Sequence, residues 1–190
     1  MPVTTLDPKT ALVVIDLQNG VAVLPGEPYS TADVINRTAE LADAFRKHDL
    51  PVVLVRVSFA ADGSDRLPGR TELQRRTGTP TANAAEIVDQ LAGHPEDIIV
   101  TKRNWGAFYG TDLDVHLRRR GITQIVLTGI ATSIGVESTA RAAYEHSYNV
   151  TLATDAMTDL SADSHDHALT RIFPRLGETG TTAEIIALLG

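Results

Sequence analysis

Two oppositely charged side chains stand where buried strands of this chain are expected to end. Asp16 closes the apolar run 11–15, and Lys102 directly follows the expected strand 97–101. In one partly buried cleft, a carboxylate and an ammonium stabilise each other's charged forms. Together they can move a proton and hold a developing negative charge. The same placement also fits a structural ion pair at a sheet edge, so the sequence leaves both interpretations open.

A tight turn in the stretch 125–141 is the third element with chemical potential. Apolar, β-favouring residues lead into it, and a helix rich in small residues is expected from 134 to 146. The first N–H groups of a helix are unpaired, and the helix dipole is positive there. The backbone N–H groups around Ala131 and Gly135 are therefore candidates for binding an oxyanion.

The turn offers little for nucleophilic attack by a side chain. Ser133 is the nearby hydroxyl, together with Thr132, and no Gly-x-Ser-x-Gly elbow surrounds it. The turn also has neither the GxGxxG nor the GKS/T pattern of a phosphate-binding loop. The chain has no cysteine at all, which excludes a thiol nucleophile, a disulfide and thiolate metal ligands.

Other residues near these strand ends are candidates for lining a substrate pocket. Trp105, Phe108 and Tyr109 follow Lys102 closely, and aromatic rings there can wall a pocket for a planar or apolar substrate. Core or subunit-interface packing is the alternative role for these rings. Gln18, in the turn after the first strand, is expected beside the same pocket.

The segment 59–83 has no clear hydrophobic period and is expected to be a long loop. Loops of this length in compact domains are often functional, although a solvated surface excursion is an equal alternative here. Arginines in and just before this segment could bind an acidic substrate; they are Arg56, Arg66, Arg70, Arg75 and Arg76.

Composition excludes several other classes of function. The net charge of −7 gives no electrostatic support to nucleic-acid binding. No run of 18 apolar residues exists, so no membrane partner is expected, and the N-terminus has no signal-peptide pattern, which makes the cytoplasm the default location. His165 and His167 are near acidic residues, but positions i and i+2 of a helix point apart. We therefore expect no metal site.

Strand-like and helix-like segments alternate along the chain. Strands are expected at 11–15, 52–57, 97–101, 124–130 and 149–156, with a short edge strand at 176–179. Helices are expected at 31–48, 84–91, 112–120, 134–146, from 161 or 164 to 172, and at 183–190. This alternation predicts an α/β fold, a doubly wound parallel sheet with helices on both faces, formed by residues 1–190 as a single domain.

Three motifs in this order resemble the isochorismatase-like (cysteine hydrolase) superfamily. They are VVIDLQNG from residue 13, TKRNWGAFYGTDL from residue 101 and GIATSIGVESTAR from residue 129. The resemblance runs from about residue 10 to 156. It implies a three-layer α/β/α fold with a six-stranded parallel sheet, and homodimers or homotetramers. It implies no cofactor.

The resemblance also implies a site made of Asp16, Lys102 and the residue at position 135. In the amidase members that residue is the cysteine nucleophile, whereas this chain has Gly135 and looks closest to an uncharacterised subgroup with IGVESTAR. Family members commonly have a non-proline cis peptide in this turn, which corresponds here to Ile130–Ala131. The Asp-x-His of the nicotinamidase metal site is missing after the second strand.

Two functions therefore remain in competition. The first is a hydrolase that acts without a cysteine on a small carboxylate-bearing substrate, with Asp16 as general acid/base and Lys102 holding the substrate or steadying Asp16. True isochorismatases, which the chain resembles at position 135, cleave a vinyl ether without a covalent nucleophile. The second is a catalytically inactive member that binds a small molecule or serves through its assembly. A nucleophilic role for Ser133 is a remaining possibility.

Overall fold

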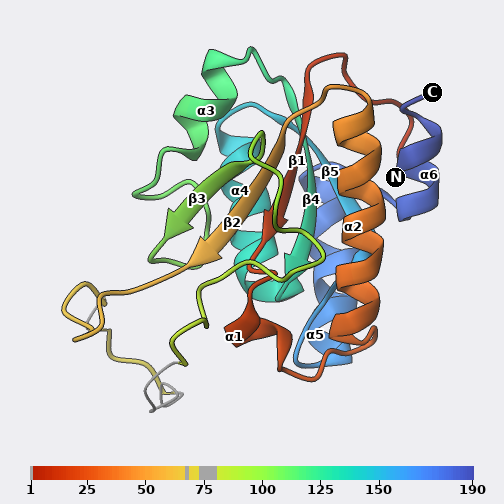
Figure 1. Cartoon of the computed structure of the whole chain (residues 1–190). Coiled ribbons are helices and arrows are strands. Elements are labelled where there is room, and N and C mark those ends of the chain that lie inside the picture. The colour runs from red at the N-terminus through yellow and green to blue at the C-terminus, as the bar shows by residue number, and fades with distance from the viewer. Residues whose placement is uncertain (1, 67–68, 73–80) are drawn as a thin grey trace.

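A six-stranded parallel sheet forms the centre of the molecule (Figure 1). The computed structural model describes residues 2–66, 69–72 and 81–190. The strand order is β3-β2-β1-β4-β5-β6, which confirms the predicted fold class. The strands are β1 (Thr10–Ile15), β2 (Val52–Val57), β3 (Ile98–Lys102), β4 (Gln124–Ile130), β5 (Asn149–Thr158) and β6 (Glu178–Gly180).

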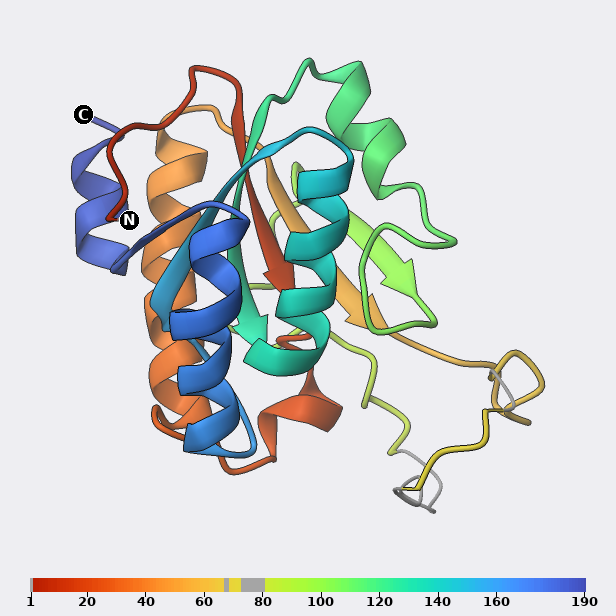
Figure 2. The same cartoon turned by 180° about the vertical axis from the view of Figure 1, so that it is seen from behind.

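Helices cover both faces of this sheet (Figures 1 and 2). The helices are α1 (Asn19–Ala22), α2 (Thr31–Lys47), α3 (Leu113–Arg119), α4 (Glu137–Glu145), α5 (Ala162–His167) and α6 (Thr182–Ala187). A π-helical turn, Thr132–Val136, leads into α4, and a second one, Ala168–Ile172, continues α5. A short 3₁₀ turn, Phe173–Arg175, follows the second π-helical turn.

Alternate residues of β1 supply the two cores. Ala11, Val13 and Ile15 pack on the side of α3 and α4, whereas Leu12 and Val14 pack on the side of α2 and α6. All five of these strand residues are buried, as expected for a central strand covered on both faces. The residues that follow β1 are therefore attached to a strand that is packed on both faces.

Two helix starts follow the expected capping chemistry. The Ser30 hydroxyl accepts the Asp33 N–H at 3.1 Å at the beginning of α2. Thr181 and Glu184 form a capping box at the beginning of α6, each side chain accepting the other's backbone N–H. No helix in the described part of the chain is long and apolar enough to cross a membrane.

The predicted helix at 84–91 is wrong. This segment instead pairs with the chain that follows β1: the Asn19 N–H donates to Glu86 O at 2.9 Å, and the Val88 N–H donates to Leu17 O at 3.2 Å. Val88 is buried with Leu91 in the core beside α2. The apolar residues of the segment 84–91 are thus in the core, as a helix would have placed them. Its backbone, however, forms hydrogen bonds with the chain after β1 and not within a helix.

The segment 59–83 has no helix or strand among its described residues. Arg75 and Arg76, which were candidates for binding an acid, lie outside the described residues. Arg66 lies inside them, close to the ends of β2 and β3, and it becomes important at the site.

Candidate active site

The carboxyl ends of β1 and β4 place the predicted residues beside one another. These strands are neighbours in the sheet, and Ile15 of β1 is in register with Gly129 of β4. The strand order reverses between them, since β1 leads outward to β2 and β3 while β4 leads to β5 and β6. Ligands of open α/β sheets bind at such a switch point, outside the carboxyl ends of the strands.

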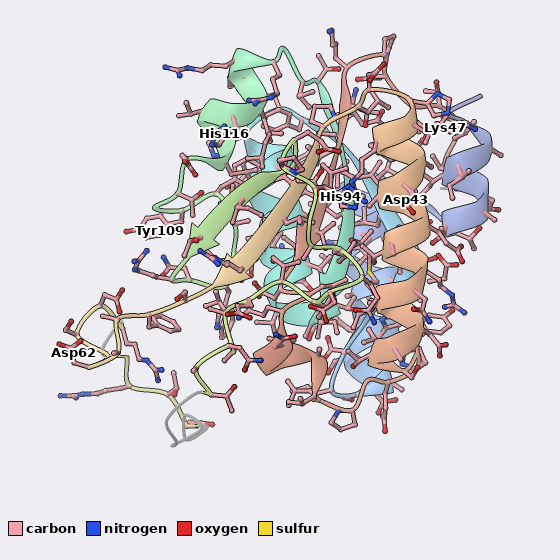
Figure 3. All side chains as sticks on the ribbon, viewed as in Figure 1. Asp43, Lys47, Asp62, His94, Tyr109 and His116 are labelled. Atoms are coloured by element: carbon pink, nitrogen blue, oxygen red, sulfur yellow. The ribbon has the colours of Figure 1, made fainter. Side chains whose placement is uncertain are left out.

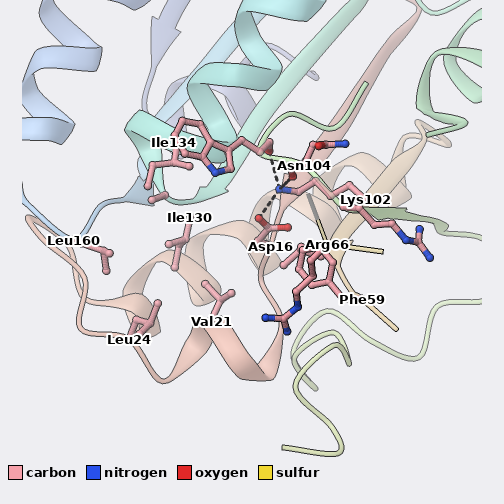
Figure 4. A pocket seen from close by; sticks show the side chains of 15 residues that line it. Asp16, Val21, Leu24, Phe59, Arg66, Lys102, Asn104, Ile130, Ile134 and Leu160 are labelled. Carbon is pink, nitrogen blue, oxygen red and sulfur yellow. Dashed lines mark hydrogen bonds and ion pairs between the residues drawn. The ribbon is translucent and has the colours of Figure 1, made fainter. Parts of the chain in front are cut away.

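Asp16 and Lys102 form a buried ion pair across the ends of the strands (Figure 4). Lys102 Nζ lies 2.7 Å from Asp16 Oδ2, and the Lys102 side chain is 2% exposed. The same Nζ donates to Trp105 O at 2.7 Å and to Asn104 O at 3.2 Å. An ammonium has three N–H donors, so these three acceptors use all of them.

Burial raises the pKa of Asp16 from 3.8 to about 6, and this effect outweighs the charge and hydrogen bond of Lys102, which lower it. The second carboxyl oxygen, Oδ1, is buried and has no hydrogen-bond partner. The backbone of Asp16 is also unusual, because its φ of 56° lies in the left-handed region. A residue held in this conformation directly after a buried strand has a fixed direction for its side chain.

A cavity of about 590 Å³ opens above the ion pair (Figure 4). Its walls are mostly apolar, and its charged residues are Asp16, Lys102, Arg66 and Arg103. The remaining lining residues are Val21, Leu24, Val57, Phe59, Asn104, Trp105, Ile130, Ala131, Ile134, Gly135 and Leu160. An apolar pocket with a few convergent charged groups is the usual form of a small-molecule site.

Gly135 lies within reach of the Asp16 carboxylate. A Cβ at this position would stand 3.5 Å from Asp16 Oδ2 and 3.5 Å from Trp105 O. It would also stand only 2.9 Å from Cγ2 of Ile15, closer than real Cβ contacts allow. A side chain at position 135 would therefore adjoin the ion pair, and the packing at this position is tight.

The turn after β4 has the cis peptide between Ile130 and Ala131 that the resemblance implies. Both residues line the cavity. Ala131 O accepts the N–H groups of Ile134 at 3.1 Å and Val136 at 3.2 Å, which closes the π-helical turn. The expected helix start at residue 134 is thus replaced by a wider turn, and regular α-helix begins at Glu137.

Three predicted pocket residues do not line the cavity. Gln18 clamps backbone instead: its Nε2 donates to Val57 O at 3.0 Å and Ala84 O at 2.9 Å, and its Oε1 accepts the Val57 N–H. Phe108 is buried in the core, where it stacks on the His146 ring at 5.1 Å. Ser133 is in the turn but outside the cavity lining, and its N–H donates to Asp159 Oδ2 at 2.6 Å.

The other aromatic residues of this run are exposed. Trp105 lines the cavity with its side chain 67% exposed, whereas Tyr109 projects into solvent away from the cavity (Figure 3). Sequence reasoning did not single out Phe59, Leu24 or Leu160, which complete the apolar walls. These three come from loops whose direction has no sequence signal.

In the described ranges, no group of three or more histidine, aspartate or glutamate side chains gathers in a way that could hold a metal ion. His165 is buried and its Nδ1 lies 2.8 Å from Thr132 Oγ1, whereas His167 is exposed. The two histidines thus point in different directions from α5, as their spacing predicts.

Comparison with known proteins identifies the family of this chain. The isochorismatase domain family matches residues 10–184. The uncharacterised isochorismatase family protein YwoC of Bacillus subtilis is 46% identical over 180 residues, covering 94% of this chain and 93% of that protein. Ureidoacrylate amidohydrolase RutB of Methylobacterium radiotolerans is 32% identical over 210 residues, covering 97% of this chain and 81% of its own length.

A solved structure extends the agreement to the whole fold. The isochorismatase family protein of Burkholderia thailandensis superposes with a TM-score of 0.92 at 52% identity, and the match covers 97% of each chain. The family match covers nearly the whole chain, and it includes both strand ends that form the cavity. This chain belongs to the isochorismatase family.

Proposed function

We propose that this protein is a hydrolase that acts without a cysteine nucleophile on a small carboxylate-bearing substrate, with Asp16 as its general acid/base. The observation that carries the proposal is the state of Asp16. Its pKa is raised to about 6 by burial, and one of its oxygens has no partner. A carboxyl group with a pKa near the working pH can both deliver and take up a proton.

Lys102 has the role of fixing Asp16. Its three donors are used by Asp16 Oδ2, Asn104 O and Trp105 O, so none is left for a substrate carboxylate. The ammonium holds one carboxyl oxygen in place and compensates its charge once the proton has left. It also ties the loop carrying Trp105 to the floor of the cavity. Of the two roles considered for Lys102, this favours the one in which it steadies Asp16.

Arg66 is the cation best suited to hold the substrate carboxylate. Its Nε is buried and has no hydrogen-bond partner, and its guanidinium lies over the Phe59 ring at 4.8 Å. Arg103, the other arginine of the cavity, is already paired with Asp65 at 2.5 Å. A guanidinium fork binds a carboxylate through two parallel hydrogen bonds. The related RutB is named for ureidoacrylate, which is also a carboxylate.

Cleavage of an enol ether of a carboxylic acid fits these groups. Protonated Asp16 delivers its proton to the methylene carbon, and the ether carbon becomes an oxocarbenium ion. A water molecule adds to that carbon, and its proton passes to the Asp16 carboxylate. The resulting hemiketal collapses to an alcohol and a 2-keto acid. These reaction steps consume one water molecule and regenerate the protonated Asp16. They need no covalent nucleophile, which suits a chain without cysteine.

The glycine at position 135 has a place in this reaction. Gly135 lines the cavity without a side chain, so the reacting water and substrate can approach its backbone closely beside Asp16. The N–H groups of Ala131 and Gly135 remain predicted donors to an anionic oxygen, which in this reaction is that of the substrate carboxylate, because the protonation step itself builds positive charge. Ser133 and Val136 cannot share that role, because their N–H groups bond to Asp159 and Ala131 O.

The experiment is a turnover assay with carboxylate-bearing enol ethers, isochorismate among them. Wild type should release the keto acid, and Asp16→Ala should not; equal turnover by both would refute the role of Asp16. Arg66→Gln should raise KM with a smaller effect on kcat. Arg103→Gln is the matched control, since it removes an arginine of the same cavity whose guanidinium is already paired with Asp65.

A family member that binds a small molecule, or serves through its assembly, is the alternative. The absent thiol and the exposed apolar rim favour it: Trp105 is 67% and Leu160 is 54% exposed. Gly135→Cys separates the two functions when the variant is screened on amides. Gained amidase activity would argue that the catalytic groups are intact, whereas an inert variant with ligand in the cavity would favour binding. Light scattering would test the homodimer or homotetramer that the resemblance implies.

A further inference from the structure

The turn that carries Gly135 rests on two buried polar side chains behind it. Thr132 Oγ1 lies 2.8 Å from Nδ1 of His165 in α5, and the next N–H along the turn, that of Ser133, donates to Asp159 Oδ2 at 2.6 Å. Thr132, Asp159 and His165 are each at most 4% exposed. Buried polar groups that are hydrogen-bonded to one another help to fix one arrangement of the backbone.

The turn divides its residues between two sides. Ile130, Ala131, Ile134 and Gly135 line the cavity, whereas the two residues between them bond away from it to α5 and the end of β5. α5 packs directly against this turn at the carboxyl end of the sheet (Figure 1). A displacement of Thr132 would therefore be passed along the turn to Ala131, Ile134 and Gly135, which line the cavity beside the ion pair.

His165 is well suited to hold Thr132. Burial lowers its pKa, although the nearby charges of Asp159 and Asp166 act in the opposite direction, so the imidazole is neutral at neutral pH. The edge of its ring faces Tyr29, with 6.0 Å between the ring centroids. The imidazole is thus confined by packing on one side and by a single short hydrogen bond on the other.

We propose that His165 is a positioning residue: through the hydroxyl of Thr132 it sets where Ile134 and Gly135 stand opposite Asp16. The inference rests on the cavity being the working site of the proposed hydrolase. The structural part of the proposal is that the position of the turn depends on its hydrogen bond to α5. This dependence exists whatever reaction the cavity performs. It can therefore be tested without turnover.

The test measures the backbone amide resonances of Ile134 and Gly135 by NMR in wild type and variants. His165→Leu and Thr132→Val should each shift both resonances, and the double variant should add little to either single change, because both remove the same bond. His165→Asn and Thr132→Ser, which keep hydrogen-bonding groups, should restore most of the wild-type shifts. His167→Leu is the matched control on the exposed side of α5 and should leave them in place.

A purely structural role gives a different result. Folded variants that lose stability while both resonances stay in place, or shifts that simply add in the double variant, would overturn the proposal. If His165→Leu does not fold, Thr132→Val and Thr132→Ser, which differ by one hydroxyl, carry the test. On an accepted enol ether, Thr132→Val should lower kcat by about 10- to 100-fold with little change in KM, as expected for misplaced groups. Failure of turnover in wild type would refute the hydrolase and leave the NMR result intact.

Discussion

Two ion pairs with largely buried side chains lie at opposite ends of the sheet. They differ in how many oxygens of the carboxylate have a hydrogen-bond partner. Arg46, at the end of α2, binds Asp97, just before β3, through Nη2 at 2.6 Å and Nε at 3.3 Å, one bond to each carboxylate oxygen. Arg46 Nη1 also donates to Asp43 at 2.8 Å. The Asp97 side chain is 2% exposed, and neither partner lines the cavity at the other end.

The Asp16–Lys102 pair has side chains of similar exposure, 11% and 2%, but a different hydrogen-bonding pattern. Here the cation is fully used, but the carboxyl keeps one oxygen without a partner and adjoins a cavity. Burial alone therefore does not separate a structural pair from a reactive one. The distinguishing feature is whether the carboxylate is satisfied, because an unsatisfied buried oxygen raises the cost of ionisation and leaves a group free to act.

Replacing Asp16 by asparagine should impair catalysis, whereas the same replacement of Asp97, at the other end of the sheet, should not. Asp16→Asn removes the proton donor and should lower kcat/KM for an enol ether by about 10²- to 10⁴-fold, the range for general acid catalysis. Asp97→Asn should leave kcat/KM of the folded enzyme unchanged. Steady-state kinetics of both variants provide the measurement, and similar losses in both would contradict the distinction.

The free energy of unfolding should fall more in Asp97→Asn than in Asp16→Asn, which is the reverse of the order expected for catalysis. Asp97→Asn leaves the partly buried Arg46 with only the exposed Asp43 to compensate its charge, and should lower the free energy of unfolding by about 3 kcal/mol, the lower end of the range for breaking a buried pair. Asp16→Asn should cost less at pH 7, because the folded protein already disfavours the ionised form of Asp16. Urea unfolding at neutral pH measures both. A larger loss for Asp16→Asn would show that its pair is mainly structural.

The pH dependence of stability should also identify Asp16. Its pKa is about 6 in the folded protein and near 3.8 when unfolded, so the folded state binds this proton more tightly. Stability from this group is present below pH 3.8 and is lost as pH rises towards 6, by about 3 kcal/mol in total. Asp16→Asn lacks this loss. Its stability relative to wild type should therefore improve by most of that amount, about 2 kcal/mol, between pH 4 and pH 7, and a constant difference would contradict the raised pKa.

A smaller loss of stability is expected when a methyl group is added at position 135, beside the cavity. Gly135→Ala brings a Cβ within 2.9 Å of Ile15 Cγ2, and such overpacking should cost about 1–3 kcal/mol of stability. Gly106→Ala is the matched control, because its Cβ would meet no atom closer than 3.4 Å. Thermal unfolding compares the two variants, and equal losses would mean that position 135 has more room than its neighbours indicate.

Sequence patterns located the parts of the site that are attached to strands. Continuous apolar runs predicted β1 and β4, and parallel strands bring their carboxyl ends to one edge, so Asp16 and the turn at Gly135 could be placed together. Lys102 was found as a strand-end residue in the same way. What the sequence could not supply was the use of all three Lys102 donors, because two of the acceptors are backbone carbonyls of a loop without periodicity.

Loop residues were predicted less well for the same reason. Trp105 and Phe108 stand three positions apart in one aromatic run, yet one lines the cavity and the other is buried in the core. Arg66 was one of several arginines with equal claims until its unpaired Nε separated it from the rest. The segment 84–91 had a helical pattern of apolar residues, but hydrogen bonds to the chain after β1 determined its backbone.

The pH dependence of kcat/KM for isochorismate or another accepted enol ether tests the central claim most directly, because it reports the ionisation of the free enzyme. If Asp16 is the general acid, kcat/KM should be level below pH 6 and fall about tenfold per pH unit above it. The fall in kcat/KM above pH 6 should be absent in Asp16→Asn. A rate that rises through pH 6, or wild-type protein that turns over no carboxylate-bearing enol ether, would contradict the proposal.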